Sequence, residues 1–155
     1  MNNLNLYVKG EVKKQQFLQN ISTRQLAEML GMDYQRVGKA LRHGVYNPAV
    51  MYEICNALKI NASSVTKDAK PVSSTHELIA EVRKQMYIHK ISIAELALKL
   101  KCHYSAVATF ISGGHTTKFS CYDLCELFDI PWEGDHDGCT SKVTTADTSK
   151  RQTDI

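Results

Sequence analysis

The chain has 155 residues, 19 of them Lys or Arg and 16 Asp or Glu, which gives a formal net charge of +3 at pH 7. This length accommodates one ordinary domain or two small ones. The sequence has no apolar run long enough to cross a bilayer and no apolar core of a signal peptide at its start, so we expect a cytoplasmic protein without a membrane partner. Its five cysteines are then expected to be reduced thiols.

One segment occurs twice in the chain, 70 residues apart. Residues 11–60 align with residues 81–130 without a gap, and 15 of these 50 positions are identical. An ungapped match of this length indicates that one small domain was duplicated. The first copy carries the basic excess: residues 1–61 contain eight Lys or Arg against four Asp or Glu, whereas residues 76–131 contain six of each. Binding of a polyanion is therefore predicted for the first copy.

Four helices are predicted in each copy. In the first, an opening helix ends near Asn20, and Ser22 is expected to cap the second helix. Gly31 supplies the following turn, because the left-handed conformation costs glycine no Cβ clash. Asp33 is expected to cap the third helix, and a fourth helix follows after a loop at residues 44–48. The second copy is expected to have helices at residues 78–90, 92–100, 104–112 and 120–128.

Composition divides the chain into four parts. The segment between the copies is polar, rich in Ser and Thr and contains a proline, which is typical of a linker. The end of the chain has almost no apolar residues and cannot support a packed core, so we expect it to be disordered. The predicted parts are a first domain at residues 1–61, a linker at 62–75, a second domain at 76–132 and a tail at 133–155.

The second and third helices have the pattern of a helix-turn-helix. Ala27 allows close packing, Gly31 forms the turn and Val37 anchors the third helix. At these residues the sequence resembles the lambda-repressor-like (Xre/Cro) family. The resemblance is carried by Ile21-Ser22, Leu26-Ala27, Leu30-Gly31-Met32, Val37 and the loop Gly44-Val-Tyr-Asn-Pro48.

This resemblance implies an all-α fold of two tandem four-to-five-helix domains joined by a linker. It further implies a sequence-specific regulator of transcription, repressor-like and of the type found in phages and mobile elements, with double-stranded DNA as its partner. The sequence departs from the family at Thr23 and Ile93, where a glutamine is frequent. It departs again at Lys101, which replaces the turn glycine in the second copy and is expected to be strained.

The resemblance places base contacts at the exposed start of the third helix. The chemistry agrees, because Arg reads guanine and Gln reads adenine in the major groove. Other polar residues nearby are suited to phosphate contacts, which position the protein without specifying sequence. The predicted base contacts are Tyr34, Gln35, Arg36 and Lys39, and the predicted phosphate contacts are Thr23, Arg24, Arg42, Tyr46 and Asn47.

The second copy does not retain the basic residues of this face. Arg24, Arg36, Lys39 and Arg42 correspond to Ala94, Ala106, Thr109 and Ser112. Since phosphate neutralisation supplies most non-specific affinity, this copy should bind DNA more weakly by itself. Its candidate DNA contacts are His103, Tyr104, Ser105, Thr109, His115 and Lys118.

An alternative is that the second copy contacts a protein through Phe110 or Phe119 on an exposed face. The corresponding alternative for the whole chain is a helix-turn-helix scaffold that acts as an interaction or inhibitor module. A homodimer is also open.

The spacing of cysteine and histidine near the end of the chain resembles that of zinc ligands. Cys121 and Cys125 are followed by His136 and Cys139, a spacing compatible with zinc ligands. However, Cys121 and Cys125 align with Met51 and Cys55 in the 70-residue register, which favours small buried hydrophobic residues. We therefore predict no metal and no cofactor. Because the sequence has no nucleophile elbow and no phosphate-cradling glycine loop, we do not expect an enzyme.

Overall fold

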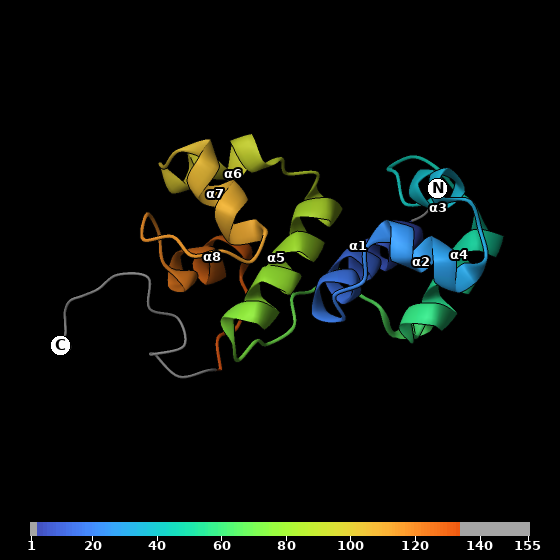
Figure 1. The fold of residues 1–155 in the computed structure, drawn as a ribbon. Coiled ribbons are helices and arrows are strands. Elements are labelled where there is room, and N and C mark those ends of the chain that lie inside the picture. Colours follow the sequence, from blue (N-terminus) through green and yellow to red (C-terminus); the bar gives the residue numbers. More distant parts are fainter. Residues whose placement is uncertain (1–2, 134–155) are drawn as a thin grey trace. The chain divides into compact units, whose positions relative to one another are not determined.

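The computed structural model describes residues 3–133, and over this range the fold is all-α (Figure 1). Eight α-helices, one short 3₁₀ turn and no strand are present among these residues. None of these helices combines the length and hydrophobicity required to cross a membrane. The elements are α1 (Asn3–Leu18), α2 (Thr23–Leu30), α3 (Tyr34–Ala40), α4 (Pro48–Leu58), η1 (Ala62–Ser64), α5 (Thr75–His89), α6 (Ile93–Leu100), α7 (Tyr104–Ile111) and α8 (Cys121–Phe128).

The chain divides into two compact units whose boundaries differ from those expected from composition. The first unit comprises Met1–Asp68 and Arg83–Ile88, and the second comprises Ala69–Val82 and His89–Ile155. The segment predicted as a linker contributes to both units, since Val65 is buried in the first and Val72 in the second. The predicted tail lies outside the described residues except for Glu133, whose N–H donates to the Val72 carbonyl.

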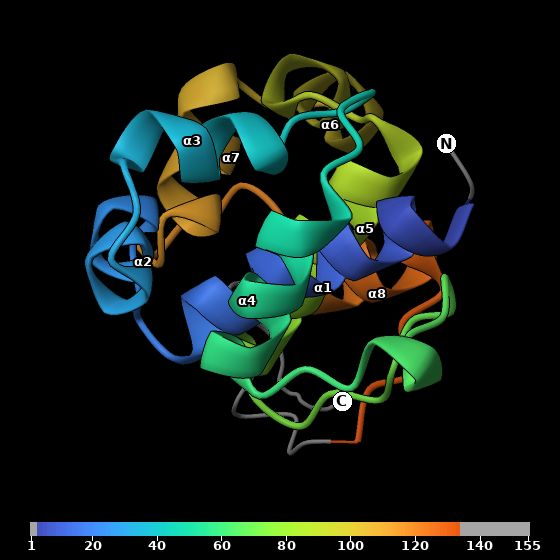
Figure 2. The same cartoon turned by 90° about the vertical axis from the view of Figure 1, so that its right-hand side faces the viewer.

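The core of the first unit forms where α4 packs against α1, α2 and α3 (Figure 2). Val12, Leu26, Val37 and Ile54 are each fully shielded from solvent there. These residues come from four different helices, so the apolar spacing of each helix converges on one cluster. Burial of this kind contributes roughly 1.5–3 kcal/mol for each large aliphatic side chain. It orders helices that would be too short to be stable alone.

Matched helix ends occur in the two copies. Ser22 and Ser92 accept hydrogen bonds from the third residue of α2 and α6, which confirms the predicted cap at Ser22. Left-handed residues end equivalent helices even where glycine is absent, and Lys101 does so with a φ of 57°. That conformation costs a residue with a side chain about 1 kcal/mol. The matched left-handed positions are Asn20 and Lys90, Gly31 and Lys101, and Lys59 and Asp129.

One local expectation is corrected by the structure, and one loop differs between the copies. Asp33 occupies the N-cap position of α3, but its side chain accepts no hydrogen bond from that helix, so the prediction of a side-chain cap was wrong. The loops before the fourth helices also differ between the copies. Asn47 caps α4, whereas α8 begins three positions later in the shared register, after its cap Ser120.

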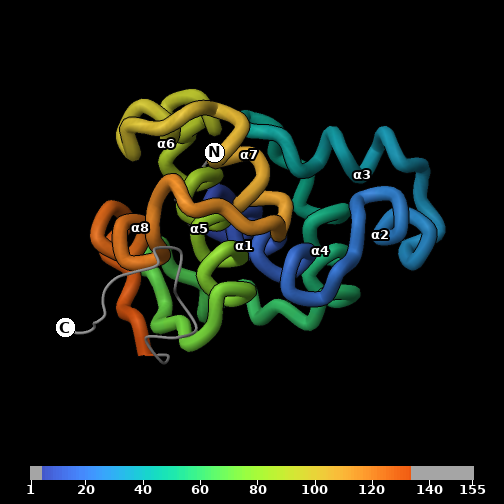
Figure 3. Tube along the Cα trace, turned by 60° about the vertical axis from the view of Figure 1, so that its left-hand side comes forward, coloured from blue at the N-terminus to red at the C-terminus, as the bar shows by residue number. Residues whose placement is uncertain are grey.

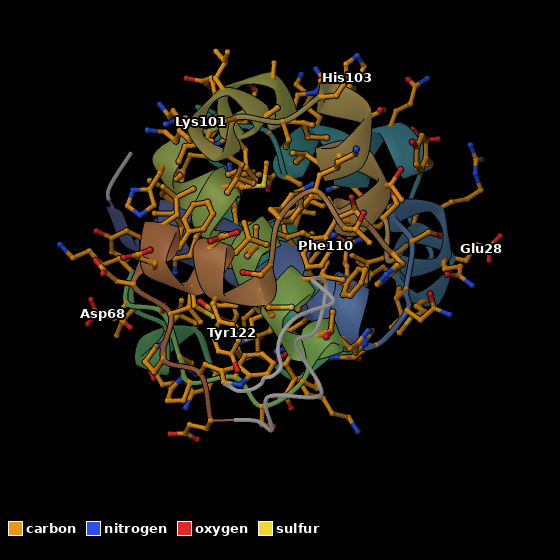
Figure 4. All side chains as sticks on the ribbon, turned by 90° about the vertical axis from the view of Figure 1, so that its left-hand side faces the viewer. Glu28, Asp68, Lys101, His103, Phe110 and Tyr122 are labelled. Carbon is orange, nitrogen blue, oxygen red and sulfur yellow. The ribbon has the colours of Figure 1, made fainter. Side chains whose placement is uncertain are left out.

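Phe110 and Phe119 lie in the core of the second unit, not on an exposed face as the alternative prediction required. They are 6% and 5% exposed, and their rings meet edge to face with centroids 5.3 Å apart. Figure 3 follows α6, α7 and α8 around this unit, and Figure 4 shows Phe110 among its side chains. In the first copy alanines occupy both positions, Ala40 and Ala49. The two aromatic rings therefore fill the second core, and the exposed-Phe prediction was wrong.

Cysteines occupy buried positions, as their alignment with apolar residues predicted. Cys55, Cys121 and Cys125 are buried. Burial, aided by the neighbouring Cys121, raises the pKa of Cys125 to about 11, so this thiol stays protonated and unreactive near neutral pH. His136 and Cys139 lie outside the described residues.

A close helix crossing within the first unit joins α1 to residues 83–88. A Cβ atom added to Gly10 would lie 2.8 Å from Ile88 Cγ1, a distance that real Cβ contacts do not reach. Lys84 is fully buried beside it, and its Nζ lies 3.2 Å from Glu11 Oε1. The two groups form a buried charge pair. Glycine at position 10 thus lets residues 83–88 of α5 approach α1 closely enough for the Lys84–Glu11 pair to form.

Reciprocal cation–aromatic contacts flank the crossing. The Lys13 ammonium lies 5.8 Å from the ring centre of Tyr87, and the Arg83 guanidinium lies 4.6 Å from that of Phe17. Lys13 aligns with Arg83 and Phe17 with Tyr87 in the 70-residue register. Contacts of this kind contribute about 0.5–2 kcal/mol each, more where water is excluded.

Glycine substitutions give a matched test of the crossing. Gly10→Val should destabilise the protein by about 1–3 kcal/mol, the usual cost of overpacking. Gly38→Ala, in α3, should be neutral or stabilising by up to about 1 kcal/mol, because open space surrounds that position and alanine favours helix. Urea unfolding of the full chain measures both. Equal effects of the two substitutions would show that α1 is not closely packed at Gly10.

Acid should weaken the first unit through Glu11. Burial by itself raises the pKa of Glu11, but the hydrogen bond from Gln15 and the charges of Lys14 and Lys84 outweigh it, and the pKa lies below its ordinary value. Its stabilisation is therefore complete above the unfolded pKa of about 4.3 and is lost as the pH falls through the lower folded pKa. The difference in unfolding free energy between wild type and Glu11→Gln should shrink from pH 7 to pH 3. Glu53→Gln, an exposed control, should change stability at pH 7 by less than about 0.5 kcal/mol.

Candidate nucleic-acid interface

One face of α3 is exposed and polar, and the opposite face is buried. Val37 and Ala40 point into the core, which fixes the rotation of the helix. The four residues predicted to contact bases are all solvent-exposed as a result. They are Tyr34, Gln35, Arg36 and Lys39.

Arg24 and Tyr34 bring the starts of α2 and α3 together. The Arg24 guanidinium lies over the Tyr34 ring, 4.4 Å from its centre. Both side chains are exposed, so the pair forms a solvent-facing platform that carries one positive charge and one phenol hydroxyl. In the second copy the arginine is replaced by Ala94, so Tyr104 has no such partner from the equivalent position.

Thr23, at the start of α2, is partly buried and already accepts a hydrogen bond. Its Oγ1 atom lies 3.3 Å from Gln16 Nε2, and the same amide donates to the Ile21 carbonyl. A threonine hydroxyl that accepts one bond retains its own hydrogen for donation. Gln16 therefore orients Thr23 without consuming the group that a phosphate oxygen would accept.

Lys9 of α1 anchors the loop that follows α3, a role that was not predicted from the sequence. Its side chain is fully buried, and Nζ donates to the carbonyls of Arg42, at 2.7 Å, and Val45. The Asn5 amide also donates to Val45 at 3.4 Å. Burial lowers the pKa of Lys9, and the two carbonyls supply the polar partners that a buried ammonium requires. The available signal was a lysine on an apolar helix face where the second copy has Ile79.

Tyr87 holds the same loop from its other end. Its hydroxyl donates to the Leu41 carbonyl at 2.6 Å, and its ring stacks on His43 with centres 4.0 Å apart. His43 Nε2 in turn lies 2.8 Å from the Tyr87 carbonyl. Burial raises the pKa of Tyr87 to about 12, so its hydroxyl remains a donor over the physiological range. This contact was also not predicted, because it joins residues 46 positions apart.

The predicted phosphate contacts in this loop divide into two kinds. The side chains of Arg42 and Tyr46 are exposed and available to a ligand. Asn47 is engaged, since its Oδ1 atom accepts from the Val50 N–H at 3.3 Å and caps α4. Its side-chain amide hydrogens are the groups left to reach a phosphate.

In the second copy the equivalents of the four basic residues are uncharged, and the surface is partly apolar. Leu98 of α6 is 79% exposed and Tyr104 of α7 is 53% exposed. His103 Nδ1 accepts from the Ser105 N–H at 3.1 Å and lies 2.9 Å from its hydroxyl. His103 therefore caps α7, and Ser105 is the residue whose N–H it caps. Thr109, His115 and Lys118 are all exposed to solvent.

Comparisons with models of known protein families, with curated proteins and with solved structures gave no match. The residues and their geometry therefore carry the functional inference.

Replacing Lys9 with the residue of the second copy should release the loop after α3. Lys9→Ile leaves the carbonyls of Arg42 and Val45 without their buried donor, which costs about 1–3 kcal/mol. Hydrogen exchange should speed up in residues 42–47 before the rest of the first unit. Lys39→Met removes an exposed lysine and is the matched control, with a change in stability below about 0.5 kcal/mol. Equal exchange in the two variants would contradict the anchoring role.

Proposed function

We propose that this chain is a regulator of transcription that binds double-stranded DNA in a sequence-specific way. In this proposal each copy is a lambda-repressor-like domain, α2 and α3 are a helix-turn-helix, and α3 enters the major groove. The observation that carries the proposal is the exposed face of α3. Gln35 and Arg36 on it are the residue types that read adenine and guanine through paired hydrogen bonds.

The basic side chains around α3 support the proposal that this surface contacts the DNA backbone. Arg24 and Arg42 are exposed beside the proposed reading residues. Each phosphate that they neutralise releases condensed counterions, which favours binding at low salt. The buried anchors Lys9 and Tyr87 hold the loop that carries Arg42 and Tyr46. A pre-ordered loop loses less entropy when it meets a rigid duplex.

The first copy is the main DNA-binding element in this proposal, and the second copy has another role. Its equivalents of the four basic residues are uncharged. Without those charges the exposed Tyr104 is available for contact with a protein, since tyrosine is enriched at protein interfaces. An interaction or inhibitor module is therefore the second candidate function.

Selection from a random pool of DNA duplexes tests the proposal with the full chain. A single motif should be enriched, and Arg36→Ala should lower affinity for that motif by about 1–3 kcal/mol while relaxing preference at one base pair. Glu28→Ala, which removes an exposed side chain of α2, is the control and should retain the preference. If no motif is enriched, the chain is not a sequence-specific regulator and the interaction role is favoured.

Salt dependence separates the contributions of the copies. Residues 83–88 belong to the first unit, so cutting the chain between the two copies would remove part of that unit. Substitutions in the full chain are therefore better suited to this test than isolated halves. The first-copy set Arg24→Ala, Arg36→Ala, Lys39→Thr and Arg42→Ser should flatten the salt slope, by up to about 0.9 for each phosphate that is no longer neutralised. The single change Lys118→Ala in the second copy should flatten it by no more than the value for one phosphate. A slope unchanged by the first-copy set would place the DNA-binding surface elsewhere.

A further inference from the structure

The first unit contains an apolar pocket beside the loop after α3, and of the proposed DNA contacts only Tyr46 lines it. Its volume is about 350 Å³, within the range of small-ligand sites. It opens between α1, α4 and η1. The apolar lining is formed by Val8, Met51, Tyr52, Cys55, Ile60 and Ala62. Asn56 and Tyr46 also line it, and both are exposed to solvent.

In the second copy an aromatic residue stands in register with the pocket residue Ala62. Position 132, which aligns with Ala62, is a tryptophan, and its ring meets that of Tyr122 at a centre distance of 6.1 Å and an angle of 68°. Tyr122 aligns with the pocket residue Tyr52 and projects from α8 (Figure 4). A parallel bridge between Val72 and Trp132 holds this segment in place. The second copy thus supplies its own aromatic ring beside the tyrosine that both copies share.

The chain that leads to the two positions has the same backbone course in both copies up to residues 60 and 130. Lys59 and Asp129 are both left-handed, with φ of 61° and 55°. Directly after them, the N–H groups of Ile60 and Ile130 donate to the carbonyls of Cys55 and Cys125 at 2.8 and 2.9 Å. The two backbones therefore leave α4 and α8 in the same way. They part only at the next residues, where η1 begins in the first copy.

Tryptophan carries a bicyclic aromatic ring, whereas alanine carries only a methyl group. The apolar space beside Tyr52 and Ala62 is open, whereas in the second copy the Trp132 ring packs edge to face on Tyr122. Trp132 Nε1 is buried and has no hydrogen-bond partner among the residues that the structure describes. Apolar contact and shape therefore hold this ring, without a hydrogen bond from its N–H.

We propose that the pocket beside Tyr52 binds a free planar aromatic molecule of about the size of indole. The ring lies against Tyr52 as Trp132 lies against Tyr122, since aromatic pairs prefer offset or edge-to-face contact. The carboxamide of Asn56 at the rim offers a donor and an acceptor to a polar substituent. Such a ligand removes apolar pocket surface from water, which is the main source of affinity in sites of this kind.

Tyr46 connects this pocket to the loop after α3. It lines the pocket, and it follows Val45, whose carbonyl Lys9 and Asn5 hold. An aromatic ligand would therefore alter DNA affinity through this loop. This linkage rests on the proposed function, whereas binding of the ligand does not.

Titration of the full chain with indole, followed by calorimetry and by NMR chemical shifts, tests the site. One indole should bind per chain. Ala62→Trp fills the pocket in cis and should weaken binding at least tenfold while raising the melting temperature. Trp132→Ala opens the second copy and should raise the stoichiometry from one to two.

Rim substitutions keep the test decisive if either core variant fails to fold. Tyr52→Ala, at an exposed tyrosine, should weaken indole binding at least fivefold. Tyr104→Ala, at an exposed tyrosine outside the pocket, is the matched control and should leave it unchanged. The shifts caused by indole should map to residues 46–62 in the wild type.

Three results would overturn the proposal. Absence of saturable binding at millimolar indole would show that the pocket takes no such ring. Binding that survives both Ala62→Trp and Tyr52→Ala would place the ligand elsewhere. A tryptophan-containing peptide that binds more than a hundredfold more tightly than indole would identify a peptide-docking site instead of a site for a free molecule. Indole binding without any effect on selected DNA would leave the pocket assigned and refute only its linkage to DNA.

Discussion

The first unit depends on the close approach of α1 to residues 83–88 at Gly10. A side chain at that position would occupy the space of Ile88, so the helices meet only because glycine has none. The approach buries Lys84 against Glu11. A buried ion pair adds little net stability over an apolar pair, but removal of one partner leaves an uncompensated charge. The crossing is therefore specific in register, since a shift along either helix would separate the two charges.

The two residues that hold the loop of the candidate DNA interface lie on the helices of this crossing. Tyr87 lies on the same stretch of α5 as Lys84, and its hydroxyl reaches the Leu41 carbonyl at the end of α3. Lys9 lies on α1 beside Gly10 and reaches the next carbonyls along the loop. Polar groups of the loop are thus satisfied from the buried side, and its basic and aromatic side chains are left to face solvent. This division of roles explains how a short loop of mostly polar residues has a defined conformation.

The two copies keep one backbone plan and differ in how they fill it. Their equivalent helices end in left-handed residues at matched positions, and this geometry is retained even when lysine replaces glycine. Alanines of the first copy become Phe110, Phe119 and Trp132 in the second. Each larger ring occupies space within its own unit, while the basic residues of the surface disappear. One copy thus has four basic residues on this face and an open pocket. The other has uncharged residues at those four positions and a core that contains Phe110 and Phe119.

The sequence by itself determined the all-α class, the duplicated unit, the approximate helix limits and the exposure of the residues on α3. These features depend on local periodicity and capping, which are properties of neighbouring residues. The side-chain cap at Asp33 and the exposed phenylalanines were predicted wrongly, because a side chain's direction depends on what packs against it.

Only the tertiary structure decided which distant residues support the candidate site. Lys9 and Tyr87 contact the loop after α3 from 33 to 46 positions away, and the pocket beside Tyr52 is recognised only when Ala62 is compared with Trp132 in space. The sequence does not distinguish a buried lysine from an exposed one. Their roles differ because desolvation forces the buried one to find fixed carbonyl partners, and those partners are brought to it only by the packing of helices.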